Sequence, residues 1–150
     1  MQIPIAKPQF HKDDMTRIQD ALDRGWVGMG PYVASFEAAF ARYTRASDAV
    51  SCSSGTTALH LALAAAQIQP GDEVIVPSFT WVASVNAVLY LGAVPVLCDI
   101  DLDTYALCPL ALEQAITERT KAVMPVHLFG GAAPMKTIMK IAAQHGLAVI

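Results

Sequence analysis

From about residue 49 onward, short apolar blocks alternate with longer segments rich in helix-forming residues. Blocks of four or five apolar residues are typical of buried strands, and the segments between them have the length of helices. The pattern predicts strands at 49–52, 73–77, 94–98, 122–126 and 147–150, and helices at about 56–67, 80–91, 110–116 and 134–144. This alternation predicts an α/β fold with a mainly parallel sheet covered by helices on both faces.

The first 48 residues follow a different pattern. They begin with an arm that leads into a short helix, which we expect to start at Asp13 or Asp14 and to end at Gly25. A glycine-rich turn over 26–31 follows, and then an amphipathic helix. The apolar face of that helix carries Val33, Phe36, Phe40 and Tyr43.

Composition and charge exclude several classes of function. The net charge is −3 and no basic stripe is present, so nucleic-acid binding is not expected. The segment 74–98 has no charged residue, but prolines, an asparagine and a glycine divide it into strand and helix lengths, so we expect no membrane span. Three cysteines without CxxC spacing indicate neither a disulfide framework nor a zinc site. A cytoplasmic protein with no metal is expected.

The segment Ser53–Thr57 joins the first predicted strand to a helix. The first amide N–H groups of a helix have no intrahelical partner, and the helix dipole places partial positive charge there. Gly55 allows close approach of a ligand to the backbone, and hydroxyl groups flank it on both sides. The segment therefore predicts a phosphate site, while an ordinary helix cap at Ser54 or Thr56 is the alternative.

Two further strand ends carry candidate ligand-binding side chains, since ligands of open α/β sheets bind beyond the carboxyl ends of the strands. Trp81 follows the strand 73–77, where its indole face could stack on a flat heteroaromatic ligand, or where it could belong to the core. His127 ends the strand 122–126 and is either a ligand-binding or a structural histidine.

Taken together, these pieces resemble fold-type I enzymes that use pyridoxal phosphate (PLP), and within them the DegT/DnrJ/EryC1/StrS family of nucleotide-sugar aminotransferases. The matching pieces lie in order along nearly the whole chain, and the ordered set is far more specific than any one piece. They are Gly30-Pro31, Phe36-Glu37, Phe40, Ser54-Gly55-Thr56, Ala58-Leu59, Pro70 to Val74, Pro77 to Trp81, Gly92-Ala93, Pro95, Asp99-Ile100-Asp101, Thr104 and Pro125-Val126-His127.

The resemblance implies roles for particular residues. Gly55 and Thr56 would hold the cofactor phosphate, and Trp81 would stack on its pyridine ring. Gly28 and Gly30 would lie near the subunit interface and the sugar-nucleotide pocket, with His127 as a weaker candidate for substrate binding. The enzyme would be a homodimer that transfers an amino group from an amino-acid donor to a nucleotide-linked keto-sugar.

The resemblance also exposes a gap. The Asp that pairs with the pyridine nitrogen and the Lys that forms the Schiff base are expected beyond Ile150, so we assign no catalytic residue to this chain. We interpret residues 1–150 as the N-terminal part of the PLP-binding large domain, with an arm over about 1–30 and a truncated end, and expect the fragment alone to be inactive. A sugar dehydratase of the same family, which uses the aminated cofactor PMP, and a non-catalytic ligand-binding module remain alternatives.

Overall fold

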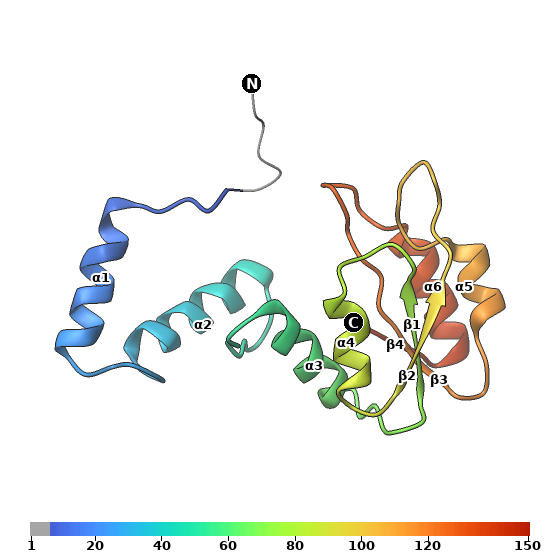
Figure 1. The fold of residues 1–150 in the computed structure, drawn as a ribbon, viewed down its shortest axis with the longest axis horizontal. Coiled ribbons are helices and arrows are strands. Elements are labelled where there is room, and N and C mark those ends of the chain that lie inside the picture. Colours follow the sequence, from blue (N-terminus) through green and yellow to red (C-terminus); the bar gives the residue numbers. More distant parts are fainter. Residues whose placement is uncertain (1–6) are drawn as a thin grey trace. The chain divides into compact units, whose positions relative to one another are not determined.

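The computed structural model describes residues 7–150, which form two compact units that divide between Ser51 and Cys52. The first unit contains helix α1 (Lys12–Asp23) and helix α2 (Pro31–Thr44), shown in blue and cyan in Figure 1. The helix begins at Lys12, one or two residues before the predicted start at Asp13 or Asp14, and the Asp14 side chain accepts a hydrogen bond from the His11 amide (2.8 Å) at the helix N-terminus. Such a bond satisfies one of the amides that the first turn leaves free.

Side-chain contacts hold the turn between α1 and α2. The Asp20 carboxylate accepts hydrogen bonds from Tyr32 and Arg24, both at 3.1 Å. A Cβ on Gly30 would lie 3.0 Å from the Trp26 ring, so a side chain there would require the ring to shift. The amphipathic α2 forms as predicted, but Phe36 on its apolar face is 57% exposed.

The second unit is built around a parallel four-stranded sheet with the order β2-β1-β3-β4. Chain order and spatial order differ, so the direction of winding reverses between β1 and β3, where ligands of such sheets bind. Its elements, drawn from green to red in Figure 1, are α3 (Gly55–Ala65), β1 (Glu73–Pro77), α4 (Ala83–Leu89), β2 (Val94–Cys98), α5 (Pro109–Ala115), β3 (Thr120–Val123), α6 (Met135–His145) and β4 (Ala148–Val149).

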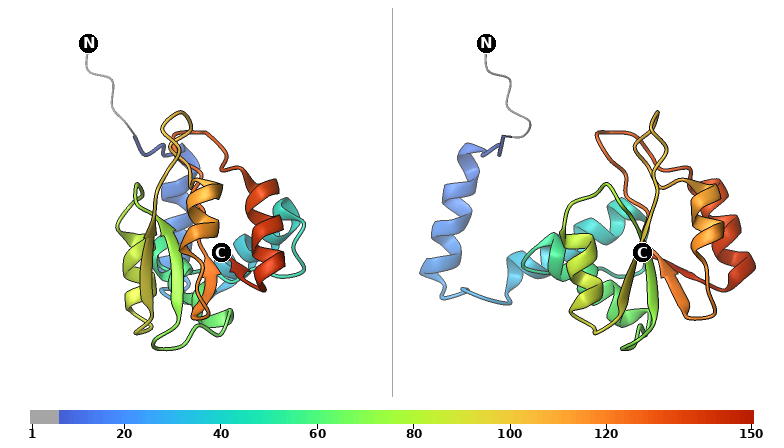
Figure 2. Two further views of the ribbon diagram at one scale, coloured as in Figure 1. Left: turned by 90° about the vertical axis from the view of Figure 1, so that its right-hand side faces the viewer. Right: turned by 45° about the vertical axis from the view of Figure 1, so that its right-hand side comes forward.

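Helices cover both faces of the sheet, as the sequence predicts, and each face has its own apolar core (Figure 2). On one face, Ile75 and Val123 pack against buried side chains of α5 and α6, such as Leu112 and Ile138. Successive strand residues point to opposite faces, so Val74 packs on the other side. The buried residues there are Leu63, Ile68, Val74, Val76, Ala87, Val88, Ala93, Ala122 and Met124.

The elements agree with the sequence prediction except at a few boundaries. Strands β1 and β2 occupy the predicted residues, whereas β3 spans 120–123 instead of 122–126. The Met124 amide still donates to the Ile75 carbonyl (2.8 Å), but the ladder with β1 pairs no residue beyond Val123. The predicted strand over 49–52 is wrong for the described residues, 7–150. The Ser51 amide and hydroxyl instead donate to the Glu37 carboxylate (2.8 and 2.9 Å), so this amide does not enter a ladder.

A buried carboxylate anchors the amino end of β1. Glu73 is 4% exposed, and its carboxylate accepts hydrogen bonds from the Thr117 hydroxyl (2.5 Å) and the Arg119 guanidinium, with Nε at 2.9 Å. These hydrogen bonds lower the pKa of Glu73 more than burial raises it. Among the described helices, none is both long and apolar enough to cross a membrane.

Candidate functional site

The N-terminus of α3 is fixed by a reciprocal pair of hydrogen bonds between Ser54 and Thr57. Ser54 is the N-cap residue in extended conformation, and its Oγ accepts from the Thr57 amide (3.2 Å). Thr57 Oγ1 accepts from the Ser54 amide (3.0 Å) and donates to the Ser54 carbonyl (2.9 Å). These two side chains therefore cap the helix by themselves.

The capping pair leaves the two residues between its members free to bind a ligand. The amides of Gly55 and Thr56 donate to no group within residues 7–150, and the same holds for the Thr56 hydroxyl. A Cβ on Gly55 would meet no atom within 4 Å, and its φ is not left-handed, so neither packing nor backbone conformation of the described chain requires glycine. The space before Gly55 is a cradle that a Cβ would fill, which suits an anion close to the backbone.

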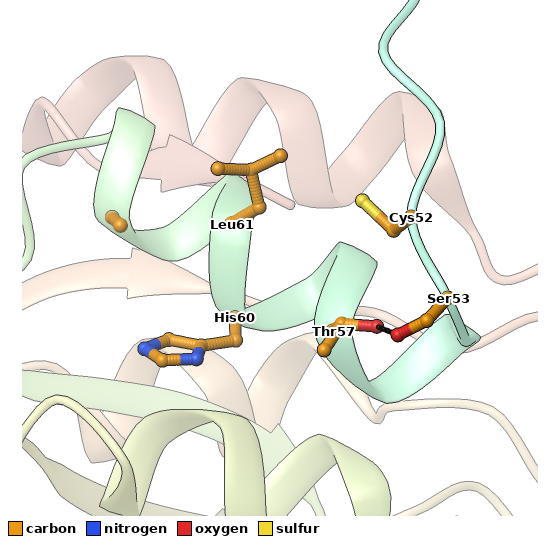
Figure 3. Close-up of a pocket in the computed structure, with 6 residues that line it drawn as sticks. Cys52, Ser53, Thr57, His60 and Leu61 are labelled. Atoms are coloured by element: carbon orange, nitrogen blue, oxygen red, sulfur yellow. Dashed lines mark hydrogen bonds between the residues drawn. The ribbon is translucent and has the colours of Figure 1, made fainter. Parts of the chain in front are cut away.

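A hollow of 390 Å³ lies along α3 beside this anion cradle (Figure 3). It is lined by Cys52, Ser53, Thr57, His60, Leu61 and Ala64, and the Ser53 and Thr57 hydroxyls are hydrogen-bonded at 3.2 Å. His60 is half-buried and packs against the Tyr90 ring at 5.7 Å. This contact accounts for His60 as a packed helix residue, in line with its position in the α3 sequence.

Trp81 stands in the segment between β1 and α4, at the edge of the sheet where ligands bind. Helix α4 begins at Ala83 rather than near Thr80, so Trp81 precedes the helix instead of belonging to it. Its side chain is 77% exposed, which excludes a place in the core of this unit. The indole face is therefore available to a ligand.

His127 lies beyond the end of β3 and not at the strand terminus that the sequence predicts. Its Nδ1 accepts a hydrogen bond from the Ala133 amide (3.0 Å), and Ala133 is buried against α6 residues. Because a neutral imidazole has one acceptor nitrogen, this bond assigns the proton to Nε2. His127 therefore has a structural role that the sequence left as one of two alternatives.

Gly28 and Gly30 belong to the first unit, while the other candidate residues belong to the second. Gly30 is the N-cap residue of α2, and a side chain there would press against the Trp26 ring. A Cβ on Gly28 would meet nothing within 4 Å, so the described structure does not explain this glycine. Their assignment to a substrate site stays a prediction.

Two other groups of residues 7–150 have structural explanations. Asp101 Oδ1 accepts the amides of Asp103 (3.1 Å) and Thr104 (2.9 Å), and the Thr104 bonds lower the pKa of Asp101, as in a structural turn. Burial raises the pKa of the Cys98 thiol to about 11. In residues 7–150, no group of three or more His, Cys, Asp or Glu side chains could hold a metal ion.

Sequence reasoning missed the three aromatic side chains that meet near the carboxyl ends of the strands. Phe79, Tyr105 and Phe129 follow β1, β2 and β3, and their ring centroids lie 5.8–6.2 Å apart. One signal was available: each is an aromatic residue in a loop that follows a strand, where an exposed ring is costly without a partner.

The comparisons with known proteins agree with this fold. A family model, that of the DegT/DnrJ/EryC1/StrS aminotransferase family, matches residues 8–150. GDP-perosamine synthase of Caulobacter vibrioides is 47% identical over 150 residues, which is 99% of this chain and 40% of the relative. This chain therefore spans less than half the length of that relative.

Solved structures show the same likeness. DesV from S. venezuelae is 45% identical with a TM-score of 0.88, over 91% of this chain and 37% of DesV. A protein from Streptococcus pneumoniae, solved in a PLP form, is 36% identical with a TM-score of 0.90, over 96% of this chain and 37% of that one.

The fold and the strand-end site define a parallel α/β protein of the kind found in fold-type I enzymes. More narrowly, the chain belongs to the DegT/DnrJ/EryC1/StrS aminotransferase family.

Proposed function

We propose that the full-length protein is a PLP-dependent aminotransferase that transfers an amino group from an amino acid to a nucleotide-linked keto-sugar. The observation that carries the proposal is the anion cradle at Gly55 and Thr56, at the start of a helix in the same unit as the exposed Trp81. The relatives support it, since one is named GDP-perosamine synthase and another was solved in a PLP form.

The residues of this chain fit the cofactor. The amides of Gly55 and Thr56, with the Thr56 hydroxyl, would donate to its phosphate, where the α3 dipole adds positive potential. Trp81 would lie against its pyridine ring and orient it. When bound, the cofactor supplies the electron sink that amino transfer requires. This chain therefore binds and orients, and the proton-transferring groups are expected beyond Ile150.

Cofactor affinity tests these assignments in the full-length protein. Replacing Thr56 with valine keeps the shape but removes the hydroxyl, and a hydrogen bond to a charged group is worth roughly 1.5–3 kcal/mol. We expect PLP, followed by its absorbance, to bind about 10- to 150-fold more weakly. Thr137→Val on the exposed side of α6 is the matched control. Equal affinity of the Thr56→Val variant and the parent would rule out the cradle as the phosphate site.

Trp81 and the reaction are tested separately. Trp81→Ala should shift the absorbance of bound PLP and weaken binding, while Trp81→Phe should restore most of both because a ring remains. Amino transfer itself is measured with an amino-acid donor and a panel of nucleotide-linked keto-sugars. Sugar product without an added amino group, at full cofactor loading, would contradict the aminotransferase assignment and favour the dehydratase.

We propose further that the protein is a cytoplasmic homodimer. Cys52, Cys98 and Cys108 are free thiols, which suits a reducing compartment. Large aromatic side chains lie on the apolar face of α2, where Tyr43 is 88% exposed. A second subunit that covered this face would remove these side chains from water. Analytical ultracentrifugation of the full-length protein tests this, and a monomer at micromolar concentration would refute the dimer.

A further inference from the structure

Three loops at one end of the sheet bring aromatic rings together. The loops that follow β1, β2 and β3 project from the same end of the sheet (Figures 1 and 2). They carry Phe79, Tyr105 and Phe129, which we call the aromatic cluster. Ring centroids lie 5.8 Å apart for Phe79 and Tyr105, 6.1 Å for Phe79 and Phe129, and 6.2 Å for Tyr105 and Phe129. Tilted and edge-on rings at this spacing attract one another.

The loop after β2 is built to present Tyr105. The Asp101 carboxylate holds the Asp103 and Thr104 amides, and the Tyr105 amide donates to the Asp101 carbonyl (2.7 Å). Tyr105 has a left-handed backbone with φ of 57°, a conformation that bulky residues rarely adopt. The turn and the ring contacts together keep Tyr105 in this position.

The loop after β3 presents Phe129 in a similar way. Phe129 (φ 52°) and Gly130 (φ 84°) occupy the centre of a tight turn, closed by the Gly131 amide on the Leu128 carbonyl at 2.8 Å. On either side of this turn, the Ala133 amide donates to His127 Nδ1, and this hydrogen bond closes the loop onto the core. Phe129 is 77% exposed and has a left-handed backbone, and its ring contacts those of Phe79 and Tyr105.

The segment that carries Trp81 has few other restraints besides a hydrogen bond between the Thr80 and Ser84 hydroxyls (3.1 Å). Its backbone is tied at its start by the Ser78 amide on the Cys98 carbonyl (2.8 Å), and at its end by the Ser84 amide on the Trp81 carbonyl (3.1 Å). Between these ties, the Phe79 ring is held by Tyr105 and Phe129. Phe79 precedes Trp81 by two residues, so its ring contacts and the Thr80–Ser84 hydrogen bond both restrain the stretch of backbone from which the indole projects.

We propose that the aromatic cluster is a positioning device for Trp81. Tyr105 and Phe129 hold Phe79, and Phe79 sets the position from which Trp81 reaches the cofactor ring. The inference rests on the proposed function, because it assigns Trp81 to that ring. Phe129 is the member to test, since it is the most exposed of the three and its removal leaves the core intact.

The test compares Phe129→Ala with Leu102→Ala in the full-length protein. Leu102 is 79% exposed and lies in the loop that carries Tyr105, but it is not a member of the cluster. Without PLP, hydrogen exchange of the amides over 79–82 should accelerate in Phe129→Ala only. With PLP, affinity should fall about two- to tenfold, as expected for the loss of aromatic pairs. The circular dichroism of bound PLP should change as well, and Phe129→Tyr should restore all three measurements.

A double substitution distinguishes positioning from direct contact. If Phe129 acts through Trp81, then Phe129→Ala combined with Trp81→Ala binds PLP no more weakly than Trp81→Ala alone. Additive losses, or unchanged exchange over 79–82 in Phe129→Ala, would overturn the inference. If Trp81→Ala leaves PLP binding unchanged, the proposed stacking fails, and the exchange measurement still decides whether the cluster braces this segment. Phe129→Leu, which keeps an apolar side chain without the ring, replaces the alanine variant if that one does not fold.

Discussion

Replacing Gly55 with alanine should weaken ligand binding without lowering the free energy of unfolding. Gly55 is the first residue of α3, where a Cβ meets no atom within 4 Å and the φ is not left-handed. Alanine therefore fits the folded chain and restricts the unfolded one, so the free energy of unfolding should be unchanged or should rise by about 0.4–1 kcal/mol.

The same methyl group would stand before the free amides of Gly55 and Thr56. A phosphate held there would lose at least one charge-assisted hydrogen bond, which is worth roughly 1.5–3 kcal/mol. The dissociation constant of PLP should therefore rise about 10- to 150-fold. Of the possible substitutions in the cradle, this one separates affinity from stability most clearly, because affinity should fall while stability should not.

Thermal unfolding without PLP and an absorbance titration with PLP measure the two effects in the full-length protein. Gly146→Ala is the control, for which stability should fall and PLP affinity should not. Gly146 ends α6 with a φ of 64°, so alanine there should cost about 1 kcal/mol of stability without weakening PLP binding. If Gly55→Ala lowers stability, or binds PLP as tightly as the parent, the account of the cradle is wrong.

Three further predictions concern single hydrogen-bonding groups. Ser54→Ala removes the cap of α3 and should cost about 0.5–2 kcal/mol, measured by urea unfolding. Glu73→Gln should destabilise the protein at neutral pH, and the difference from the parent should shrink as the pH falls below 4.5. The folded-state pKa of Glu73 is lowered, so its contribution is present above the unfolded pKa and is lost as the pH falls through the folded one. A constant difference across acidic pH would contradict this. His127→Asn keeps an acceptor near the position of Nδ1 and should preserve protection of the Ala133 amide, whereas His127→Gln should lose it, as hydrogen exchange can show.

The sequence predicts the regular part of the fold well, because buried strands and capped helices have local signals. Both β1 and β2 occupy their predicted residues, and α3 begins at the glycine of the predicted phosphate segment. The prediction over 49–52 fails because an apolar run becomes a strand only when a neighbouring strand takes its amides. Here the Glu37 carboxylate takes the amide of Ser51 instead.

The candidate site was only partly predictable, because some of its contacts also depend on neighbours that are distant in the sequence. Gly55, Thr56 and Trp81 are marked by their places at strand and helix ends, which a local pattern can show. Two other contacts join parts of the chain that are separate in sequence. The hydrogen bond from the Ala133 amide to His127 Nδ1 joins two parts of one loop, and the contact between the Phe79 and Phe129 rings joins two loops. Such pairs depend on the order of the strands in space, which single residues along the chain do not reveal.

The strand order β2-β1-β3-β4 also bears on how the protein is made. Strand β1 leaves the ribosome first, and each later strand can join an edge that is already present. Strand β2 joins one side of β1, β3 joins the other, and β4 joins β3. Among the four strands described in residues 7–150, none has to be inserted between two earlier ones, so this part of the sheet can grow outward during synthesis without breaking a pairing that has already formed.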